Sequence, residues 1–144
     1  MSWFVATIAK QSKHNWDLCK DVGLFGVSTQ GRRIGVDGIH PGDRLIVWIG
    51  GQGFKALTTI SESPRAPLDK SETPWGGGLH RFGIVIPINI DSELDTPLWL
   101  GFREGKQEKT GMTQYSLRKS FSLIPDSTGS KILDLFVAAK NSKS

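Results

Sequence analysis

Trp75 is the residue whose surroundings point most directly to ligand binding. It lies in the segment TPWGGG, residues 73–78, where proline and glycine oppose regular secondary structure. No hydrophobic periodicity assigns this large side chain to a core, and an indole on an ordered loop can stack on a flat ligand. We therefore expect Trp75 to contact a ligand. The N–H groups of Gly76 to Gly78 could also meet a phosphate, although a flexible turn is the simpler explanation.

Basic side chains are concentrated in the last third of the chain. The chain has 18 Lys and Arg against 14 Asp and Glu, a net charge of +4 and a pI near 9.4. Clustered basic side chains can neutralise phosphates and release their counterions, and a solvated surface explains them equally well. We predict phosphate contacts from Lys106, Lys109, Arg118 and Lys119, with Arg103 beside them and Arg32, Arg33 and Arg81 as the next candidates.

Residues for catalysis or metal binding do not occur at diagnostic spacing. The sequence has no recognisable Ser-His-Asp set, paired-carboxylate motif or nucleotide phosphate loop. Its histidines lack cysteines or carboxylates at zinc-ligand spacing, and the single Cys19 cannot form an internal disulfide. An enzyme would have to use His14 with Asp17 or His80 with Arg81, pairs that are ordinary on a protein surface. We expect no catalysis, no metal and no cofactor.

Length and hydropathy predict one domain over residues 1–144 in the cytoplasm. A chain of this length with 38% hydrophobic residues can bury one ordinary core. No run approaches the roughly 20 apolar residues that cross a bilayer, and residues 1–14 lack the features of a secretory signal. The domain could stand alone or belong to a larger multidomain protein.

Strand signals dominate the elements that must position Trp75. Residues 3–9 are rich in β-branched and aromatic side chains, and a short helix capped by Ser12 or Asn15 is predicted to end near Gly23. Residues 45–63 are typical of an antiparallel hairpin that turns at Gly50 to Gly53. The remaining predictions are a loop over 28–40, a central strand over 81–90 with a bulge or edge at Pro87, helical turns over 115–121, and a C-terminal helix over 127–139.

The order of these segments resembles the EVE domain and is also similar to the YTH domain, two branches of the PUA-like folds. In both, a first strand leads to a short helix and an aromatic residue, and a PGD turn introduces a hairpin whose second strand starts Gly-Phe. A later loop holds another tryptophan. The resemblance covers residues 3–90 and is carried by WFVATIA, KHNW, LFGVS, HPGDRLIVWIGGQGFKALTTISESP and the later PW. It implies an α+β fold, a small mixed β-barrel flanked by short helices.

The resemblance further implies a nucleic-acid reader whose pocket accepts one flipped base, often a methylated one. Such a pocket needs aromatic faces, polar groups that recognise the base edge, and a basic rim. Phe25 stands where the YTH pattern has its first cage tryptophan, and Trp75 stands where it has the second. Asn15 matches an edge-recognising asparagine, and Gly26 follows Phe25. Trp48 occupies a hairpin position where the EVE pattern tends to have an aromatic residue, so we predict it as a pocket wall.

Several of these assignments have plain structural alternatives. Trp48 and Phe25 could belong to the core, and Asn15 could simply cap the helix; Trp3, Trp16 and Trp99 are predicted as core residues. Phe25 also departs from the YTH pattern, since its smaller ring offers less stacking area. The expected partner is modified DNA, with an RNA reader of N6-methyladenine as the alternative. A small enzyme that acts on nucleic acid and a protein-interaction module are the rival functions.

Overall fold

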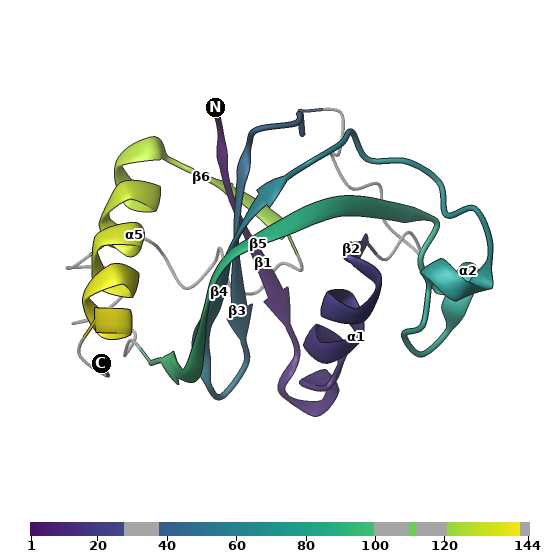
Figure 1. Ribbon diagram of the computed structural model, residues 1–144, viewed down its shortest axis with the longest axis horizontal. Helices are drawn as coiled ribbons and strands as arrows, with labels where there is room; N and C mark the ends of the chain where they lie inside the picture. The colour runs from purple at the N-terminus through teal and green to yellow at the C-terminus, as the bar shows by residue number, and fades with distance from the viewer. Residues whose placement is uncertain (28–37, 100–109, 112–120, 142–144) are drawn as a thin grey trace.

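The computed structural model describes residues 1–27, 38–99, 110–111 and 121–141. Its centre is a strongly curved mixed sheet of six strands in the order β2-β5-β4-β3-β1-β6 (Figure 1). The element bounds are β1 Trp3–Ile8, η1 Lys10–Ser12, α1 Asn15–Val22, β2 Leu24–Val27, β3 Arg44–Ile49, β4 Gly53–Ile60, η2 Lys70–Glu72, α2 Gly78–Arg81, β5 Ile84–Leu98, β6 Phe121–Ile124 and α5 Asp126–Asn141. The predicted α+β class is confirmed, and the expected small mixed β-barrel takes the form of a half-barrel sheet with flanking helices.

The centre of the sheet is formed by β1, β3 and β4. β1 pairs in parallel with β3, and β3 pairs antiparallel with β4 through the predicted hairpin. The turn depends on Gly53, whose φ of 120° and contact with the Leu98 backbone leave no room for a Cβ. Its neighbour Gly50 donates its N–H to the Ile8 carbonyl at 2.8 Å, which ties the hairpin to the end of β1.

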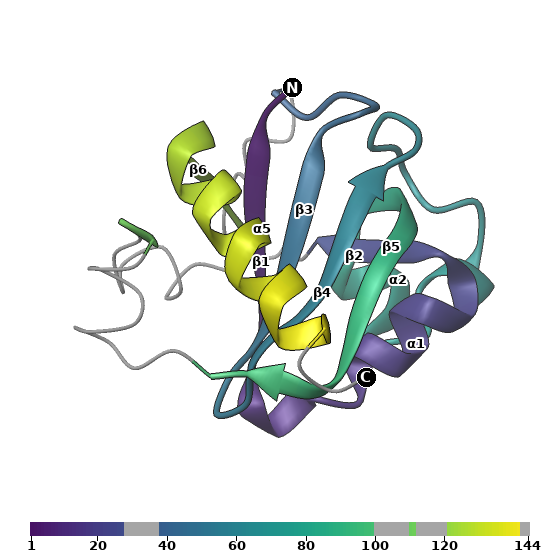
Figure 2. The ribbon, with the colours of Figure 1, turned by 60° about the vertical axis from the view of Figure 1, so that its left-hand side comes forward.

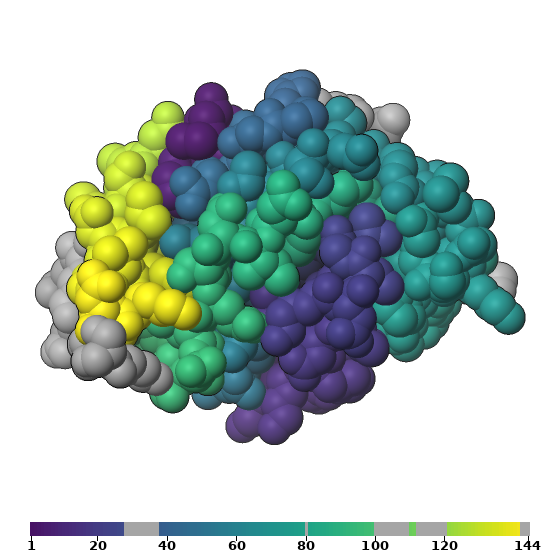
Figure 3. Space-filling model, viewed as in Figure 1, coloured from purple at the N-terminus to yellow at the C-terminus, as the bar shows by residue number. Residues whose placement is uncertain are grey.

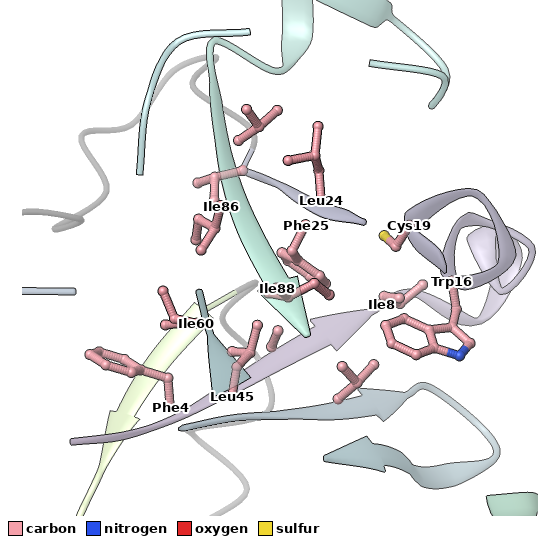
Figure 4. Packing of buried hydrophobic residues seen from close by; sticks show 14 of the residues in the cluster. Phe4, Ile8, Trp16, Cys19, Leu24, Phe25, Leu45, Ile60, Ile86 and Ile88 are labelled. Atoms are coloured by element: carbon pink, nitrogen blue, oxygen red, sulfur yellow. The ribbon is translucent and has the colours of Figure 1, made fainter. Parts of the chain in front are cut away.

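Each face of the sheet carries its own hydrophobic core. Because successive side chains of a strand point to opposite faces, Val47 and Ile49 join one cluster whereas Ile46 and Trp48 join the other. The first cluster packs α1 against the sheet through Trp16 and Cys19 (Figure 4). The second cluster lies under the long α5, which Figure 2 shows crossing the opposite face of β1, β3 and β4.

Several elements agree with the sequence predictions. The strand, the short helix and the hairpin all form, and α1 ends at Gly23, whose left-handed φ of 69° accompanies an N–H bond to the Cys19 carbonyl. The C-terminal helix also forms, as α5. No helix in the described part of the chain is long and apolar enough to span a membrane.

Three segments differ from the predictions. The expected strand over 81–90 begins three residues later, because Arg81 still belongs to α2, and continues to Leu98. β2 was not predicted, since a four-residue strand gives little periodicity. Phe121 opens β6 instead of closing helical turns, and the remainder of that predicted helix, 115–120, lies outside the described residues.

Pro87 is accommodated without a bulge. It lies just past Ile60, where β4 ends, so that side of β5 is locally an edge. There the Pro87 carbonyl accepts the Ser61 N–H at 3.0 Å, and the missing proline N–H breaks no ladder bond. The predicted alternative of an edge position is thus the one found.

Candidate functional site

A cavity opens where the end of β1, α1, β2 and α2 meet. Figure 3 shows the surface on which α1 adjoins the segment that contains α2. The cavity has a volume of about 130 Å³ and is partly open to solvent. It is lined by Thr7, Ile8, Ala9, Ser12, Asn15, Cys19, Phe25, Gly26, Trp75, Arg81 and Phe82.

Four of the five predicted base-pocket residues line this cavity together. Phe25 and Gly26 come from β2, Asn15 from α1 and Trp75 from the loop before α2, so the set extends from residue 15 to residue 75. α1 and β2 are joined only by Gly23, which explains how Asn15 and Phe25 reach the same space. The loop that carries Trp75 is brought to the same place by the tertiary fold.

Trp75 is buried more deeply than a loop residue in a Gly- and Pro-rich segment would suggest. Its exposed fraction is 3%, and its ring packs against Phe82 with centroids 5.0 Å apart and planes tilted by 57°. On the other side it touches the backbone of Gly26, where a Cβ atom would lie only 2.5 Å from Cζ3 of the indole. Gly26 is therefore required for the indole to lie as close to β2 as it does.

Phe25 forms a second aromatic wall. It is 6% exposed, lies opposite Ile86 in the β2–β5 pairing, and belongs to the same cluster as Trp75. Phe25 is therefore both a core residue and part of the cavity lining. The core and pocket positions predicted as alternatives are compatible with each other. Two buried rings on one small cavity are suited to a flat, apolar-faced ligand.

Polar groups on α1 complete the wall. Asn15 is the first residue of α1 and not its cap, a position taken by His14 without a side-chain cap bond. Its amide carries both donors and an acceptor. Cys19, one turn further on, lines the cavity as a neutral thiol, because burial raises its pKa to about 12 even though the Trp75 indole and the Gly26 N–H lower it. Among the described residues, no acceptor forms a hydrogen bond of good geometry with the indole N–H, and a neutral thiol is only a weak acceptor.

Arg81 supplies the cation at the mouth of the cavity. It is exposed, and its guanidinium carbon lies over the Phe82 ring, 5.3 Å from the ring centroid. Because Phe82 packs against Trp75, this stacking connects the rim to the aromatic wall. From the sequence, Arg81 was predicted only as a secondary candidate for phosphate contact, after the C-terminal basic residues. Phe82 was not predicted as a cavity residue, because the apolar run that contains it indicated a strand.

The predicted role of Trp48 in the pocket is wrong. Trp48 lies on the opposite face of the sheet, in the cluster under α5, and packs edge-on against Phe54 with centroids 4.7 Å apart. The cause is strand alternation, which sends Val47 and Trp48 to different faces. Trp99, predicted as a core residue, is instead 56% exposed and stacks on Trp48 at 5.5 Å, because it follows the end of β5.

Other predicted residues are placed as follows. Trp3 and Trp16 are core residues as expected, with exposed fractions of 3% and 1%. The four predicted phosphate contacts, Lys106, Lys109, Arg118 and Lys119, lie outside the described residues, as do Arg32, Arg33 and Arg103. Within the described residues, no group of three or more His, Cys, Asp or Glu side chains is arranged to hold a metal ion.

Comparison with known proteins relates this fold to solved structures. No protein-family model matches the sequence, and no curated protein matches it significantly. The complex of the YTH domain-containing protein mmi1 with RNA has a TM-score of 0.68 at 11% identity, over 99% of this chain and 87% of that one. The YTH domain of the Zygosaccharomyces rouxii MRB1 protein, in complex with N6-methyladenosine RNA, has a TM-score of 0.60 at 16% identity, over 93% and 86%.

A hypothetical protein from Leishmania major matches over 100% of this chain and 98% of its own length, with a TM-score of 0.60 at 14% identity. At such low identities the likeness establishes the fold and leaves the ligand to be determined from the site. The chain therefore has a fold like that of the YTH domains.

Proposed function

We propose that this domain is a non-enzymatic nucleic-acid reader that accepts one extruded, modified base in the cavity between Phe25 and Trp75. The observation that carries the proposal is the convergence of Asn15, Phe25, Gly26 and Trp75 on one cavity. Two aromatic rings offer stacking faces, the Asn15 amide can pair with a base edge, and Arg81 stands where a backbone phosphate would pass. Burial of the rings in a core cluster keeps the cavity preformed.

The size of the cavity supports a single base as the ligand. An engineered cavity of about 150 Å³ in another protein binds benzene, one six-membered ring. The present cavity of about 130 Å³ is comparable and is partly open, so a ring can enter while its sugar and phosphates remain outside. A methyl group on the base would add apolar contact worth about 0.8 kcal/mol if fully buried.

A binding role is favoured over catalysis by the chemistry of the lining. Among the described residues that line the cavity there is no histidine, aspartate or glutamate to act as a general acid or base. The one thiol is neutral, with its pKa raised to about 12 by burial, so it lacks the thiolate that a nucleophile needs.

Modified DNA and modified RNA are two candidate partners. The EVE resemblance in residues 3–90 favours modified DNA. The solved YTH domain with N6-methyladenosine RNA, which shares the fold, favours an RNA carrying that base as the second candidate. Both fit the same pocket chemistry, because the stacking faces and the amide do not distinguish the sugar.

The test is an equilibrium binding panel at one salt concentration. Oligonucleotides of one sequence, as DNA and as RNA, single- and double-stranded, would carry an unmodified base, 5-methylcytosine or N6-methyladenine at one position. We expect affinity to depend on the modification, and Trp75→Phe to reduce that dependence. Trp99→Phe is the matched control, since Trp99 lies outside the cavity. Equal affinity for every oligonucleotide would refute the proposal.

A further inference from the structure

The loop that carries Trp75 is attached to the sheet at Arg65. The Arg65 N–H donates to the Val85 carbonyl at 3.0 Å, and the Val85 N–H donates to the Arg65 carbonyl at 2.8 Å. On its other side, Val85 lies opposite Gly26 in the β2–β5 pairing. One residue of β5 therefore connects the start of the Trp75 loop to the glycine against which the indole packs.

The Arg65 side chain then closes the loop on itself. Its guanidinium donates to both carboxylate oxygens of Glu72, with distances of 2.8 Å for Nη1 to Oε1 and 2.9 Å for Nη2 to Oε2. Oε1 of Glu72 also accepts the Leu68 N–H at 2.7 Å. A two-pronged pair of this kind restricts the relative orientation of both side chains, which a lysine could not do.

Little freedom remains between Glu72 and the indole. Thr73 is buried, with an exposed fraction of 3%, and its N–H donates to the Lys70 carbonyl at 3.1 Å. Pro74 has a fixed φ, and the Trp75 carbonyl accepts the Gly78 N–H at 3.0 Å. The ion pair and the indole thus belong to one short, bonded segment.

We propose that Arg65 and Glu72 are positioning residues of the pocket, whose ion pair holds the Trp75 indole where it meets the base. Neither residue is among those that line the cavity, so they act through Trp75. This inference rests on the proposed function. An isolated surface ion pair contributes little to stability, but this pair is bidentate, takes a third bond from the Leu68 backbone, and lies on the loop of the pocket.

The test compares base selectivity with the position of the indole. Selectivity is the ratio of affinities for the preferred modified oligonucleotide and its unmodified form, and the Trp75 indole N–H resonance is assigned by its loss in Trp75→Phe. For Glu72→Gln we expect selectivity to fall about tenfold, the scale of one lost hydrogen bond to a charged group, and the Trp75 resonance to move or broaden. The base selectivity of Arg65→Lys should lie between those of Glu72→Gln and the parent. The reversed pair, Arg65→Glu with Glu72→Arg, should recover part of the lost selectivity.

Glu62→Gln is the matched control, because it makes the same change of charge at an exposed residue near Arg65. It should leave both selectivity and the indole resonance unchanged. A melting curve for each variant separates a displaced loop from an unfolded protein. If the parent binds selectively and Glu72→Gln retains its selectivity and its Trp75 resonance, the inference alone is overturned. If the parent shows no base preference, the proposed function fails and the inference fails with it.

Discussion

Several residues that line the cavity also belong to the hydrophobic core, and Trp75 shows this most clearly. Its indole is buried against Gly26 on one side and Phe82 on the other, so it belongs to the core as well as to the pocket wall. Removal of a buried tryptophan side chain commonly costs about 3–5 kcal/mol of stability. With alanine at this position, a loss of affinity could not be separated from a loss of stability. Phenylalanine is therefore the more informative replacement.

Trp75→Phe should weaken binding of the preferred modified oligonucleotide by up to about 1–3 kcal/mol, the range for a lost base–aromatic stack, because the smaller ring retains only part of the overlap. The salt dependence of binding should remain as in the parent, since no phosphate contact is lost. Fluorescence anisotropy at several salt concentrations measures both quantities. A variant with parental affinity and an intact fold would remove Trp75 from the site.

Gly26→Ala should destabilise the domain by about 1–3 kcal/mol and reduce base selectivity. The new methyl group would lie 2.5 Å from the indole Cζ3, so the ring or the strand must move. Gly76→Ala is a suitable control, because a Cβ there meets no atom within 4 Å. Thermal melting and the binding panel together test the prediction, which fails if both substitutions behave alike.

Cys19 should resist alkylation in the folded protein. The thiol is 2% exposed, and burial raises its pKa to about 12, so almost no thiolate is present at pH 8. Reaction with iodoacetamide at pH 8, followed by mass spectrometry, should be slow in buffer and fast in denaturant. Rapid labelling of the native protein would show that the wall of the cavity opens readily.

At the scale of elements, the carboxylates of Glu93 and Glu72 each link one segment that lines the cavity to a neighbouring part of the fold. Glu93 on β5 accepts the Trp16 indole N–H at 2.5 Å and the Lys20 ammonium at 3.3 Å, and so fastens α1 to the sheet. Burial raises the pKa of Glu93, but the Trp16 and Lys20 contacts outweigh burial and leave it below its ordinary value. Glu72 links the Trp75 loop to the sheet in a similar way, because it accepts two hydrogen bonds from Arg65, whose backbone is bonded to Val85 of β5.

Acid should loosen these attachments in a defined range. Hydrogen bonds from Arg65, with a further one from the Leu68 N–H, lower the pKa of Glu72 from 4.5 to about 2. A lowered carboxyl pKa contributes stability that is complete above about pH 4.5 and is lost as the pH falls toward 2. Because Glu72 in the folded protein protonates only as the pH approaches about 2, we expect the Trp75 indole resonance to stay in place through pH 4.5 and to shift as the pH falls toward 2. In Glu72→Gln this acid-dependent shift should be absent, and its persistence there would assign it to other groups.

For the whole molecule, the fold separates two faces of one curved sheet. The cavity lies on the α1 side, whereas Trp48 belongs to the cluster on the side of α5, and the exposed Trp99 packs against Trp48. The net charge of the chain is +4, and Arg81 is a basic residue that lines the cavity. If the proposed function holds, substitutions in the cavity should change base selectivity without changing general phosphate attraction.

Neutralisation of Lys106 and Lys109 together should weaken binding equally for modified and unmodified oligonucleotides. It should also flatten the plot of log affinity against log salt by up to about two units, because phosphate contacts release counterions without specifying sequence. Base selectivity should be unchanged, in contrast to the effect of Trp75→Phe. If the double variant keeps the parental salt slope, the phosphate contacts lie elsewhere, and Arg81→Gln is the next variant to measure.

The sequence by itself predicted many of the local elements and four of the residues that line the cavity. The Gly23 that ends α1, the glycines of the hairpin turn and the alternating strands follow from backbone preferences that act over a few residues. Asn15, Phe25, Gly26 and Trp75 were placed in the pocket by their order along the chain, and the structure brings them to one cavity. These predictions depend on local chemistry or on the family pattern.

Only the tertiary structure decided which face each strand residue occupies and what holds the loop. Trp48 faces α5 because the register of β3 sends Val47 toward the cavity side, a choice that composition alone does not make. Arg65 and Glu72 resemble ordinary surface charges in the sequence, and their link to Trp75 appears only when Val85 pairs with Arg65. These contacts between residues far apart in the chain depend on the pairing and register of β5 in the sheet, which no local sequence pattern specifies.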